Sequence, residues 1–324
     1  MVVCKSLGDL PEISQSVLTI GSFDGIHSGH LEILKEMKSL ASDNTSKSAL
    51  ITFSPHPKAV LRPDSIESRH IITTLEKKIE IFKIQGIDYL LILPFDQNLA
   101  MVDADAFLND IIIAKFNPHD IVVGYDHHFG YKRLGGIDLL LSYARTSSYN
   151  VHRIDQMAVD GIPVSSSRIR KELASGNINQ ANRLLGWNYE IKGVVEKGDG
   201  LGKKIGYPTA NINPADDRQI IPSDGVYNVD IEIKKQIYSG MCNIGNRPTV
   251  NGKNNRIEVN IFSDYDLKLY SKEVKVIFKE YLRDEKSFPS IDKLKLQLDK
   301  DKKCCLKLNR MIKGVKHVNN KRAC

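Results

Sequence analysis

The sequence lacks the apolar segments that a membrane protein or a secreted precursor would carry, and it has few cysteines. The longest apolar run, residues 89–95, is interrupted by Pro94 and is far shorter than the roughly 18 residues of a membrane-spanning helix. The N-terminus has no basic stretch followed by an apolar stretch, so we expect no signal peptide. The 5 cysteines are odd in number and include no C-x-x-C pair, which predicts reduced thiols in a cytoplasmic protein.

The composition has no bias of the kind that marks a disordered or fibrous chain. Of the 324 residues, 41% are hydrophobic and 26% are charged, with 22 Gly and 12 Pro, which is ordinary globular usage and enough chain for two domains. The net charge of +7 arises entirely in residues 301–324, where eight Lys and Arg accompany one Asp. Such a tail either contacts an anionic partner or is a solvated, frayed terminus. We favour the solvated terminus, and we expect neither a nucleic-acid nor a membrane partner.

Residues 17–186 alternate short apolar runs with segments of helical periodicity. The expected strands are residues 17–20, 49–53, 89–93, 121–123 and 150–154, and the expected helices are residues 30–42, 75–85, 105–115 and 137–145. Strands that alternate with helices predict a doubly wound parallel sheet of the α/β class, whose ligands bind at the carboxyl ends of the strands. We therefore expect a first domain at residues 1–186.

Beyond Gly186 the sequence changes to strands punctuated by glycine and proline. The expected strands are residues 189–196, 226–233, 236–242, 256–262 and 273–278. Their alternation of polar and apolar residues predicts an antiparallel, half-buried sheet or a small β-barrel. A helix is expected from residue 291 to about residue 308, with Ser290 as its N-cap and Leu294, Leu296 and Leu298 on its apolar side. The predicted second domain is residues 187–308, and residues 309–324 form the basic tail.

A glycine-rich segment with two histidines, G-S-F-D-G-I-H-S-G-H at residues 21–30, lies between the first expected strand and the following helix. Its glycines let the backbone approach a bulky anion, and the helix N-terminus supplies N–H donors for phosphate. His27 and His30 can direct their imidazoles toward the same anion, and neither has the partners of a hydrolytic triad or further zinc ligands. The segment predicts a site that stabilises charge developing on phosphorus; the alternative is a glycine-rich turn with surface histidines. The candidate phosphate-binding residues are Gly21, Ser22, Phe23, Asp24 and Gly25.

Three serines at residues 165–167 open another helical segment and precede two arginines. Hydroxyl groups at this position cap the helix and can also bind phosphate, while arginines add charge-assisted donors. The alternative is an ordinary N-cap whose arginines face solvent. We take Ser166, Ser167 and Arg170 as candidate phosphate-binding residues.

A second glycine-rich segment, G-D-G-L-G-K-K-I-G-Y-P-T-A-N at residues 198–211, combines four glycines with a pair of lysines. It does not fit the G-x-x-x-x-G-K-[ST] pattern of a Walker A loop, but it is typical of a flexible, cationic phosphate loop. Thr209 and Asn211 offer two oxygens that, with phosphate and water, suit Mg²⁺. The alternative is an ordinary glycine-rich turn. The candidate phosphate-binding residues here are Gly198, Gly202, Lys203 and Gly206.

The first half of the chain resembles the adenylyltransferase half of the bacterial bifunctional riboflavin kinase/FMN adenylyltransferase family, also called FAD synthetase. Residues 21–30 resemble its G-x-F-D-G-x-H-x-G-H signature, and residues 164–170 resemble its I-S-S-T-x-I-R segment, which closes on the ATP phosphates. T-F-S-P-H-P at residues 52–57 and G-Y-D-H-H-F-G at residues 124–130 resemble its T-F-x-P-H-P and G-x-D-F-R-F-G loops. The resemblance implies a Rossmann-like nucleotidyltransferase domain. It also implies that Asp126 positions nucleotide or flavin and that Phe53, Pro55 and Phe129 lie against the flavin.

The second half resembles the riboflavin kinase of the same family, so the resemblance extends over about residues 10–305. Residues 198–211 resemble its G-x-x-x-G-R-x-[IL]-G-[FY]-P-T-A-N signature, and residues 256–262 resemble the strand that holds its catalytic glutamate, here Glu258. The resemblance implies an antiparallel β-barrel kinase domain in which a carboxylate accepts the proton of an attacking hydroxyl. Strand alternation alone would instead make Glu258 a polar outward-facing residue. The implied flavin-binding residues of this domain are Asn243, Arg283 and Phe288.

The resemblance implies two reactions that both need Mg²⁺. Riboflavin and ATP give FMN and ADP, and FMN and ATP then give FAD and pyrophosphate. The implied partners are therefore the small molecules riboflavin, FMN, FAD and ATP, with a homo-oligomer left open. Two alternatives are a single-activity nucleotidyltransferase of the H-x-G-H type and a flavin-binding or nucleic-acid-binding protein with a decayed site. The sequence departs from the family pattern at Ser22, Ser167, His128, Lys203 and Asn260, where Asn, Thr, Arg, Arg and His are usual.

Overall fold

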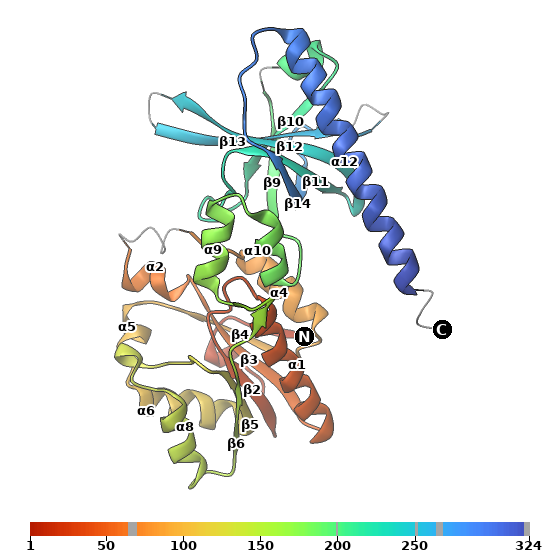
Figure 1. Cartoon of the computed structure of the whole chain (residues 1–324). Helices are drawn as coiled ribbons and strands as arrows, with labels where there is room; N and C mark the ends of the chain where they lie inside the picture. Colours follow the sequence, from red (N-terminus) through yellow and green to blue (C-terminus); the bar gives the residue numbers. More distant parts are fainter. Residues whose placement is uncertain (64–69, 199, 250–251, 264–267, 321–324) are drawn as a thin grey trace. The chain divides into compact units, whose positions relative to one another are not determined.

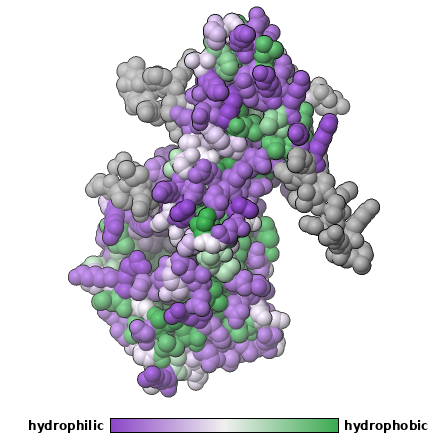
Figure 2. All heavy atoms as spheres, in the orientation of Figure 1, coloured by the Kyte–Doolittle hydropathy of each residue, from purple (hydrophilic) through white to green (hydrophobic). Residues whose placement is uncertain are grey.

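The computed structural model describes residues 1–63, 70–198, 200–249, 252–263 and 268–320 (Figure 1). The chain divides into two compact units, Met1–Ile169 and Arg170–Cys324. Within the described ranges, no helix combines the length and the apolarity needed to cross a membrane. In the view of Figure 2, polar residues cover most of the surface of each unit, and the apolar areas between them are small.

The first unit is built on a six-stranded parallel sheet with strand order β1-β4-β3-β2-β5-β6, which confirms the predicted doubly wound α/β class. All five predicted strands are present, and the added edge strand is β1. The strands are β1 (Val2–Cys4), β2 (Ser16–Ile20), β3 (Lys47–Ser54), β4 (Tyr89–Pro94), β5 (Pro118–Gly124) and β6 (Asn150–Ile154). A two-stranded hairpin, β7 (Ala158–Val159) and β8 (Ile162–Pro163), follows the sheet.

The four predicted helices of this unit are also present, one of them as a composite. The helices are α1 (Ser28–Asp43), α2 (Pro57–Leu61), α4 (Leu75–Ile84), α5 (Gln97–Ala100), α6 (Ala104–Ala106), η2 (Phe107–Ile113), α7 (Ala114–Phe116) and α8 (Ile137–Ala144). The segment η2 is π-helical and continues α6 into α7, and short 3₁₀ turns occur at η1 (Leu7–Asp9) and η3 (Tyr131–Arg133).

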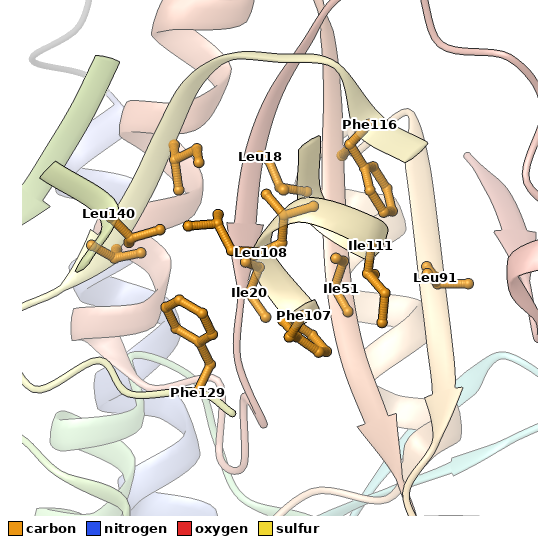
Figure 3. Packing of buried hydrophobic residues seen from close by; sticks show 14 of the residues in the cluster. Leu18, Ile20, Ile51, Leu91, Phe107, Leu108, Ile111, Phe116, Phe129 and Leu140 are labelled. Atoms are coloured by element: carbon orange, nitrogen blue, oxygen red, sulfur yellow. The ribbon is translucent and has the colours of Figure 1, made fainter. Parts of the chain in front are cut away.

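The apolar strands form the core because helices cover the sheet. Every residue of β2 is buried, as is normal for a central parallel strand. Leu18, Ile51 and Leu91 from three neighbouring strands pack with Phe107 and Phe116 (Figure 3). This packing fixes the carboxyl ends of the strands, where the loops that contain the predicted motifs begin.

The strand order reverses at β2, which has β3 on one side and β5 on the other. In an open parallel sheet, ligands bind beyond the carboxyl ends of the strands at such a switch point. The loops that follow β2 and β5 contain residues 21–27 and 125–130. The topology therefore brings the two predicted motifs together at the carboxyl ends of neighbouring strands.

The second unit contains a closed barrel of six strands in the order β10-β13-β12-β11-β14-β9, and all the neighbours that pair are antiparallel. This confirms the predicted small barrel. Its strands are β9 (Glu190–Glu196), β10 (Thr209–Pro214), β11 (Gly225–Ile233), β12 (Gln236–Thr249), β13 (Gly252–Ile261) and β14 (Glu273–Arg283). Its helices are α10 (Ile178–Leu185), α11 (Leu201–Lys204) and α12 (Ile291–Asn320), and α9 (Ser166–Ala174) spans the boundary between the units.

The boundary at Ile169 and Arg170 differs from the predicted boundary at Gly186. Helix α10 groups with the barrel because Asn182 donates a 2.9 Å hydrogen bond to the carbonyl of Phe278 on β14. The same Asn182 side chain accepts a 2.7 Å bond from the backbone N–H of Tyr189. These contacts belong to the barrel fold, so residues 170–186 are part of the second unit.

Helix α12 is longer than predicted and includes most of the basic tail, because it continues to Asn320. Ser290 accepts a hydrogen bond from the backbone N–H of Lys293, which confirms its capping role. Leu294 and Leu298 are half-buried on one side, whereas Leu296 is 56% exposed. The prediction for Leu296 was wrong because residues two apart lie on different faces of a helix.

Candidate active sites

The loop that joins β2 to α1 has an unusual backbone. Phe23 and Ile26 have φ angles of +46° and +35°, and Gly25 has a φ of +91°. Non-glycine residues rarely adopt this left-handed region, so the surrounding structure must hold the loop in place. Buried hydrogen bonds to residues 72–73 do so: Asp24 accepts from the backbone N–H groups of Ile72 and Thr73 at 3.0 and 3.1 Å.

Two further contacts complete this anchoring. The backbone N–H of Gly25 donates to the hydroxyl of Thr73 at 2.7 Å. The Phe23 ring is 2% exposed and packs edge-on against Phe82 at 5.5 Å. The side chains of Phe23 and Asp24 therefore support the loop, and a phosphate contact at these two positions would use the backbone.

His27 and His30 lie together at the N-terminus of α1. Their rings stack with centroids 3.7 Å apart and an interplanar angle of 12°. Nδ1 of His27 accepts the backbone N–H of His30 at 3.3 Å, so neutral His27 carries its proton on Nε2. Nδ1 of His30 is buried and has no hydrogen-bond partner among the described residues. A buried nitrogen of this kind is a candidate ligand contact.

Burial keeps both imidazoles neutral at physiological pH. Desolvation is the largest influence on His27 and lowers its pKa to about 4, against an opposing effect of Asp24. Desolvation also lowers the pKa of His30 well below its usual value, and the neighbouring His27 and Lys78 add to this effect. The pair therefore offers neutral hydrogen-bonding groups in place of permanent cations.

Two other elements contact the same loop. Lys78 of α4, which is 5% exposed, donates from Nζ to the carbonyl of Ser22 at 2.6 Å. Ser166 at the start of α9 donates its hydroxyl to the carbonyl of Asp24 at 2.8 Å. The N-termini of α1 and α9 therefore both lie at this loop, and helix N-termini favour anions.

The remaining predicted residues of α9 differ in their surroundings. Ser167 is exposed on the first turn, whereas Ser165 caps the helix by accepting the backbone N–H of Arg168 at 3.2 Å. Arg170 begins the second unit. Their contact with phosphate stays a prediction.

The predicted flavin-side residues of this unit follow β3 and β5. Phe53 is half-buried and packs edge-on against Phe95 at 5.6 Å, while Pro55 and Asp126 are exposed at the same sheet edge. Phe129 is 7% exposed and belongs to the core cluster with Phe107. The ring of Phe129 thus supports the fold, and its proposed contact with a flavin stays a prediction.

Sequence reasoning missed Thr73, Lys78 and His127 in this unit. The first two lie about fifty residues from the loop that they hold, and no local pattern marks them. Nε2 of His127 is buried without a partner among the described residues, and desolvation lowers the pKa of His127 to about 4. The signal in the sequence for His127 is its position directly after the predicted Asp126.

The second unit contains a cavity of about 440 Å³ at the barrel wall. Seven predicted residues line it: Gly202, Thr209, Asn211, Asn243, Glu258, Arg283 and Phe288. Among the described residues, Gly198, Lys203 and Gly206 are outside this lining. Residues that sequence reasoning missed include Tyr207, Arg256, Glu285 and the two helix residues Leu294 and Leu298. The sequence predicts these two leucines only as the apolar side of a helix, whereas in the structure they also line the cavity.

Strand register places Glu258 at the centre of the polar residues. It lies directly opposite Asn211 on β10 and directly opposite Asn243 on β12. Directly paired residues share a face of the sheet, whereas Ile257 and Val259 alternate onto the buried face. The Glu258 carboxylate forms a 3.1 Å ion pair with Arg256. The acid is therefore held in the cavity wall.

The glycine-rich segment is folded tightly against β10. A Cβ on Gly198 would lie 1.9 Å from Nδ2 of Asn211, and one on Gly202 would lie 2.2 Å from the carbonyl oxygen of Tyr207. Asn260 holds the other side by donating to the carbonyl of Pro208 at 2.7 Å. Close approach to backbone thus requires glycine at position 202, whereas a side chain at position 198 would displace the amide of Asn211.

The residues present fit a magnesium ion. Oδ1 of Asn211 is buried and has no hydrogen-bond partner in the part of the chain that the structure describes. Thr209 lies two residues away on the same face of β10. Among described residues, no group of three or more His, Cys, Asp or Glu is placed so that it could hold a metal.

Comparisons with known proteins cover nearly the whole chain. A family model described as FAD synthetase matches residues 10–168, and one described as riboflavin kinase matches residues 185–309. A bifunctional riboflavin kinase/FMN adenylyltransferase of Buchnera aphidicola is 34% identical over 307 residues, which cover 93% of this chain and 96% of the relative. The protein of the same name from Escherichia coli is 32% identical over 304 residues, with the same coverage of 93% and 96%.

A solved structure has the same fold. It is described as a macrolide-efflux protein from Streptococcus pneumoniae and has a TM-score of 0.86, 33% identity and coverage of 93% of this chain and 97% of its own. The word efflux describes that protein and is not carried over to this chain. The two family models and the names of the curated relatives indicate the same pair of activities, one for each part of the chain.

Proposed function

The chain belongs to the bifunctional riboflavin kinase/FMN adenylyltransferase family, and from this premise we propose how its two sites divide the work. It is an enzyme that phosphorylates riboflavin with ATP to give FMN and transfers the adenylyl group of ATP to FMN to give FAD. The observation that carries the assignment of residues is the pairing of Asn211 with Glu258 across two strands that line one cavity.

Glu258 is the general base of the kinase half. Its carboxylate takes the proton of the riboflavin 5′-hydroxyl while the oxygen forms a bond to the γ-phosphorus, and the bond from that phosphorus to ADP breaks. The ion pair with Arg256 supports this role because it fixes the carboxylate in the wall. The mixed lining supports a flavin, since Asn243, Arg283 and Phe288 offer polar and aromatic contacts.

Thr209 and Asn211 would hold Mg²⁺ in this half. When bound, the ion neutralises charge on the phosphates of ATP. The buried, unpartnered Oδ1 of Asn211 among the described residues supports this assignment. Gly198 and Gly202 let the loop backbone approach the same phosphates, and Lys203 adds positive charge nearby.

In the adenylyltransferase half, the FMN phosphate attacks the α-phosphorus of ATP and pyrophosphate leaves. His27 and His30 donate hydrogen bonds to the phosphates, together with the N–H groups at the starts of α1 and α9. Ser166, Ser167 and Arg170 hold the triphosphate, and Asp126 positions the nucleotide or the flavin. The stacked, neutral histidine pair supports this role because a triphosphate would supply the partner that the buried Nδ1 of His30 lacks among the described residues.

We place the enzyme in the cytoplasm, which supplies ATP. The described cysteines, Cys4, Cys242, Cys304 and Cys305, are free thiols, as a reducing compartment would keep them.

The test is to incubate the purified protein with riboflavin, ATP and Mg²⁺ and to separate the flavins by chromatography. We expect FMN first and FAD later, and neither when Mg²⁺ is chelated. FMN without FAD would contradict the role of the first unit, and no conversion would contradict both roles.

A further inference from the structure

Helix α12 forms part of the wall of the kinase cavity, through Leu294 and Leu298. In Figure 1 this helix runs beside the strands of its own unit. Within the three residues that follow Leu298 it carries two carboxylates, Asp299 and Asp301. Asp299 accepts a hydrogen bond from the hydroxyl of Tyr207, which also lines the cavity, and Asp301 contacts Arg283 at the end of β14.

The contact between Asp301 and Arg283 is a bidentate ion pair. Nη2 of Arg283 donates to Oδ2 of Asp301 at 2.8 Å, and Nε lies 3.1 Å from each carboxylate oxygen. Asp301 is only 5% exposed, and Gln297 donates to its Oδ1 at 2.8 Å. Pairs of this geometry fix the plane of a guanidinium as well as its position.

The remaining nitrogen of Arg283 is also held. Nη1 donates to the carbonyl of Asp284 at 2.9 Å, so all three guanidinium nitrogens have acceptors. The guanidinium carbon lies 5.9 Å from the centre of the Phe288 ring. Arg283 and Phe288 both line the cavity, so a side chain on α12 sets the orientation of this part of its wall.

We propose that Asp301 is a positioning residue for riboflavin in the kinase reaction, and this inference rests on the proposed assignment of the cavity to riboflavin. Asp301 acts through Arg283: it holds the guanidinium and the neighbouring Phe288 ring in one arrangement before the flavin binds. Without it, Arg283 would lose its orientation and the flavin would have to order the wall as it enters. Asp301 itself takes no proton and contacts no reacting atom.

The test measures FMN formation by Asp301→Asn in the full chain. We expect the KM for riboflavin to rise about tenfold, with the KM for ATP and the kcat at saturating riboflavin within about twofold. Conversion of supplied FMN to FAD should be unchanged, which serves as an internal control. A rise in both KM values, or no rise for riboflavin, would overturn the proposal.

The matched control is Asn309→Ala on the same helix. Asn309 is buried and accepts a 2.5 Å bond from Nζ of Lys279, but it does not line the cavity. This variant should lower the unfolding temperature and leave the KM for riboflavin within about twofold. An equal rise in KM for both variants would mean that the helix is merely loosened, and would overturn the proposal.

A milder variant covers the case in which Asp301→Asn does not fold. Gln297→Ala keeps the ion pair and removes only its support, so we expect a rise in the riboflavin KM of about threefold. No rise in a folded Gln297→Ala protein would contradict the proposal. Failure of the unaltered protein to form FMN would instead contradict the proposed function, whatever the variants do.

Discussion

The two candidate sites of this chain are built in different ways. The first gathers at the ends of parallel strands, where one continuous segment, residues 21–30, supplies the histidine pair and a helix N-terminus. The second is spread across the wall of an antiparallel barrel, where Asn211 and Glu258 meet only through strand pairing. A site of the first kind can be recognised in a short stretch of sequence, whereas a site of the second kind depends on register.

The largest expected effect separates the two sites completely. Glu258→Gln should lower the rate of FMN formation about 1,000-fold because the attacking hydroxyl loses its proton acceptor. The same protein should convert supplied FMN to FAD at the normal rate. Flavin chromatography with each substrate gives both numbers, and a comparable loss in the two reactions would contradict the separation.

The second prediction uses acid to probe the histidine pair. His27 has a pKa of about 4 in the folded chain and 6.5 as its reference value. Above pH 6.5 the imidazole is neutral in both states, so His27 does not change the free energy of unfolding. Below pH 6.5 the free energy of unfolding falls, because the unfolded chain binds the proton at a higher pH than the folded chain does. The loss should approach about 3 kcal/mol near pH 4 and level off below it.

The control for this prediction is His27→Gln, measured by urea unfolding between pH 7 and pH 4. Glutamine cannot titrate, so the decline in the free energy of unfolding should be smaller by the same amount. Equal declines in the two proteins would show that the imidazole is not desolvated in the way the structure indicates.

The third prediction concerns the close approach in the barrel. Gly198→Ala places a methyl group 1.9 Å from the present position of Asn211 Nδ2. The loop and the Asn211 side chain must therefore move apart. We expect FMN formation to fall about 100-fold, since a shift of about 1 Å at a positioned group has effects of this size. Gly8→Ala is the control, because its Cβ would meet only Ser6 at an ordinary 3.7 Å.

The smallest expected effect returns to the first site. Lys78→Met removes the bond to the carbonyl of Ser22 and should slow FAD formation from FMN about tenfold, without changing FMN formation. Lys77→Met is the matched control, since Lys77 pairs with Glu80 one turn along the same helix. If the two lysine variants behave alike, the contact with the loop has no special role.

The fold was largely predictable because its strands are apolar runs of the usual length. Strand β10 was missed, since T-A-N-I-N-P places polar residues toward the cavity and so lacks an apolar run. Helix α12 was predicted too short, because the basic composition of residues 309–320 hides a helix that continues to Asn320.

The candidate sites were predictable only in part, for a physical reason. Candidate substrate-binding residues are recognised most easily in local motifs, and the candidates at residues 21–30 and 198–211 were predicted in this way. The supporting residues, Thr73 and Lys78 for residues 21–30 and Asp301 for Arg283, act through contacts that only the folded chain brings together. No spacing in the sequence marks Asp301 as the partner of Arg283.

The most direct test of two independent sites is complementation between two damaged proteins. His30→Ala alone should turn riboflavin into FMN and stop, and Glu258→Gln alone should make FAD only from supplied FMN. A mixture of the two with riboflavin, ATP and Mg²⁺ should produce FAD, because FMN released by one protein reaches the intact site of the other. A mixture that accumulates FMN without FAD, or either variant completing both steps alone, would contradict the account.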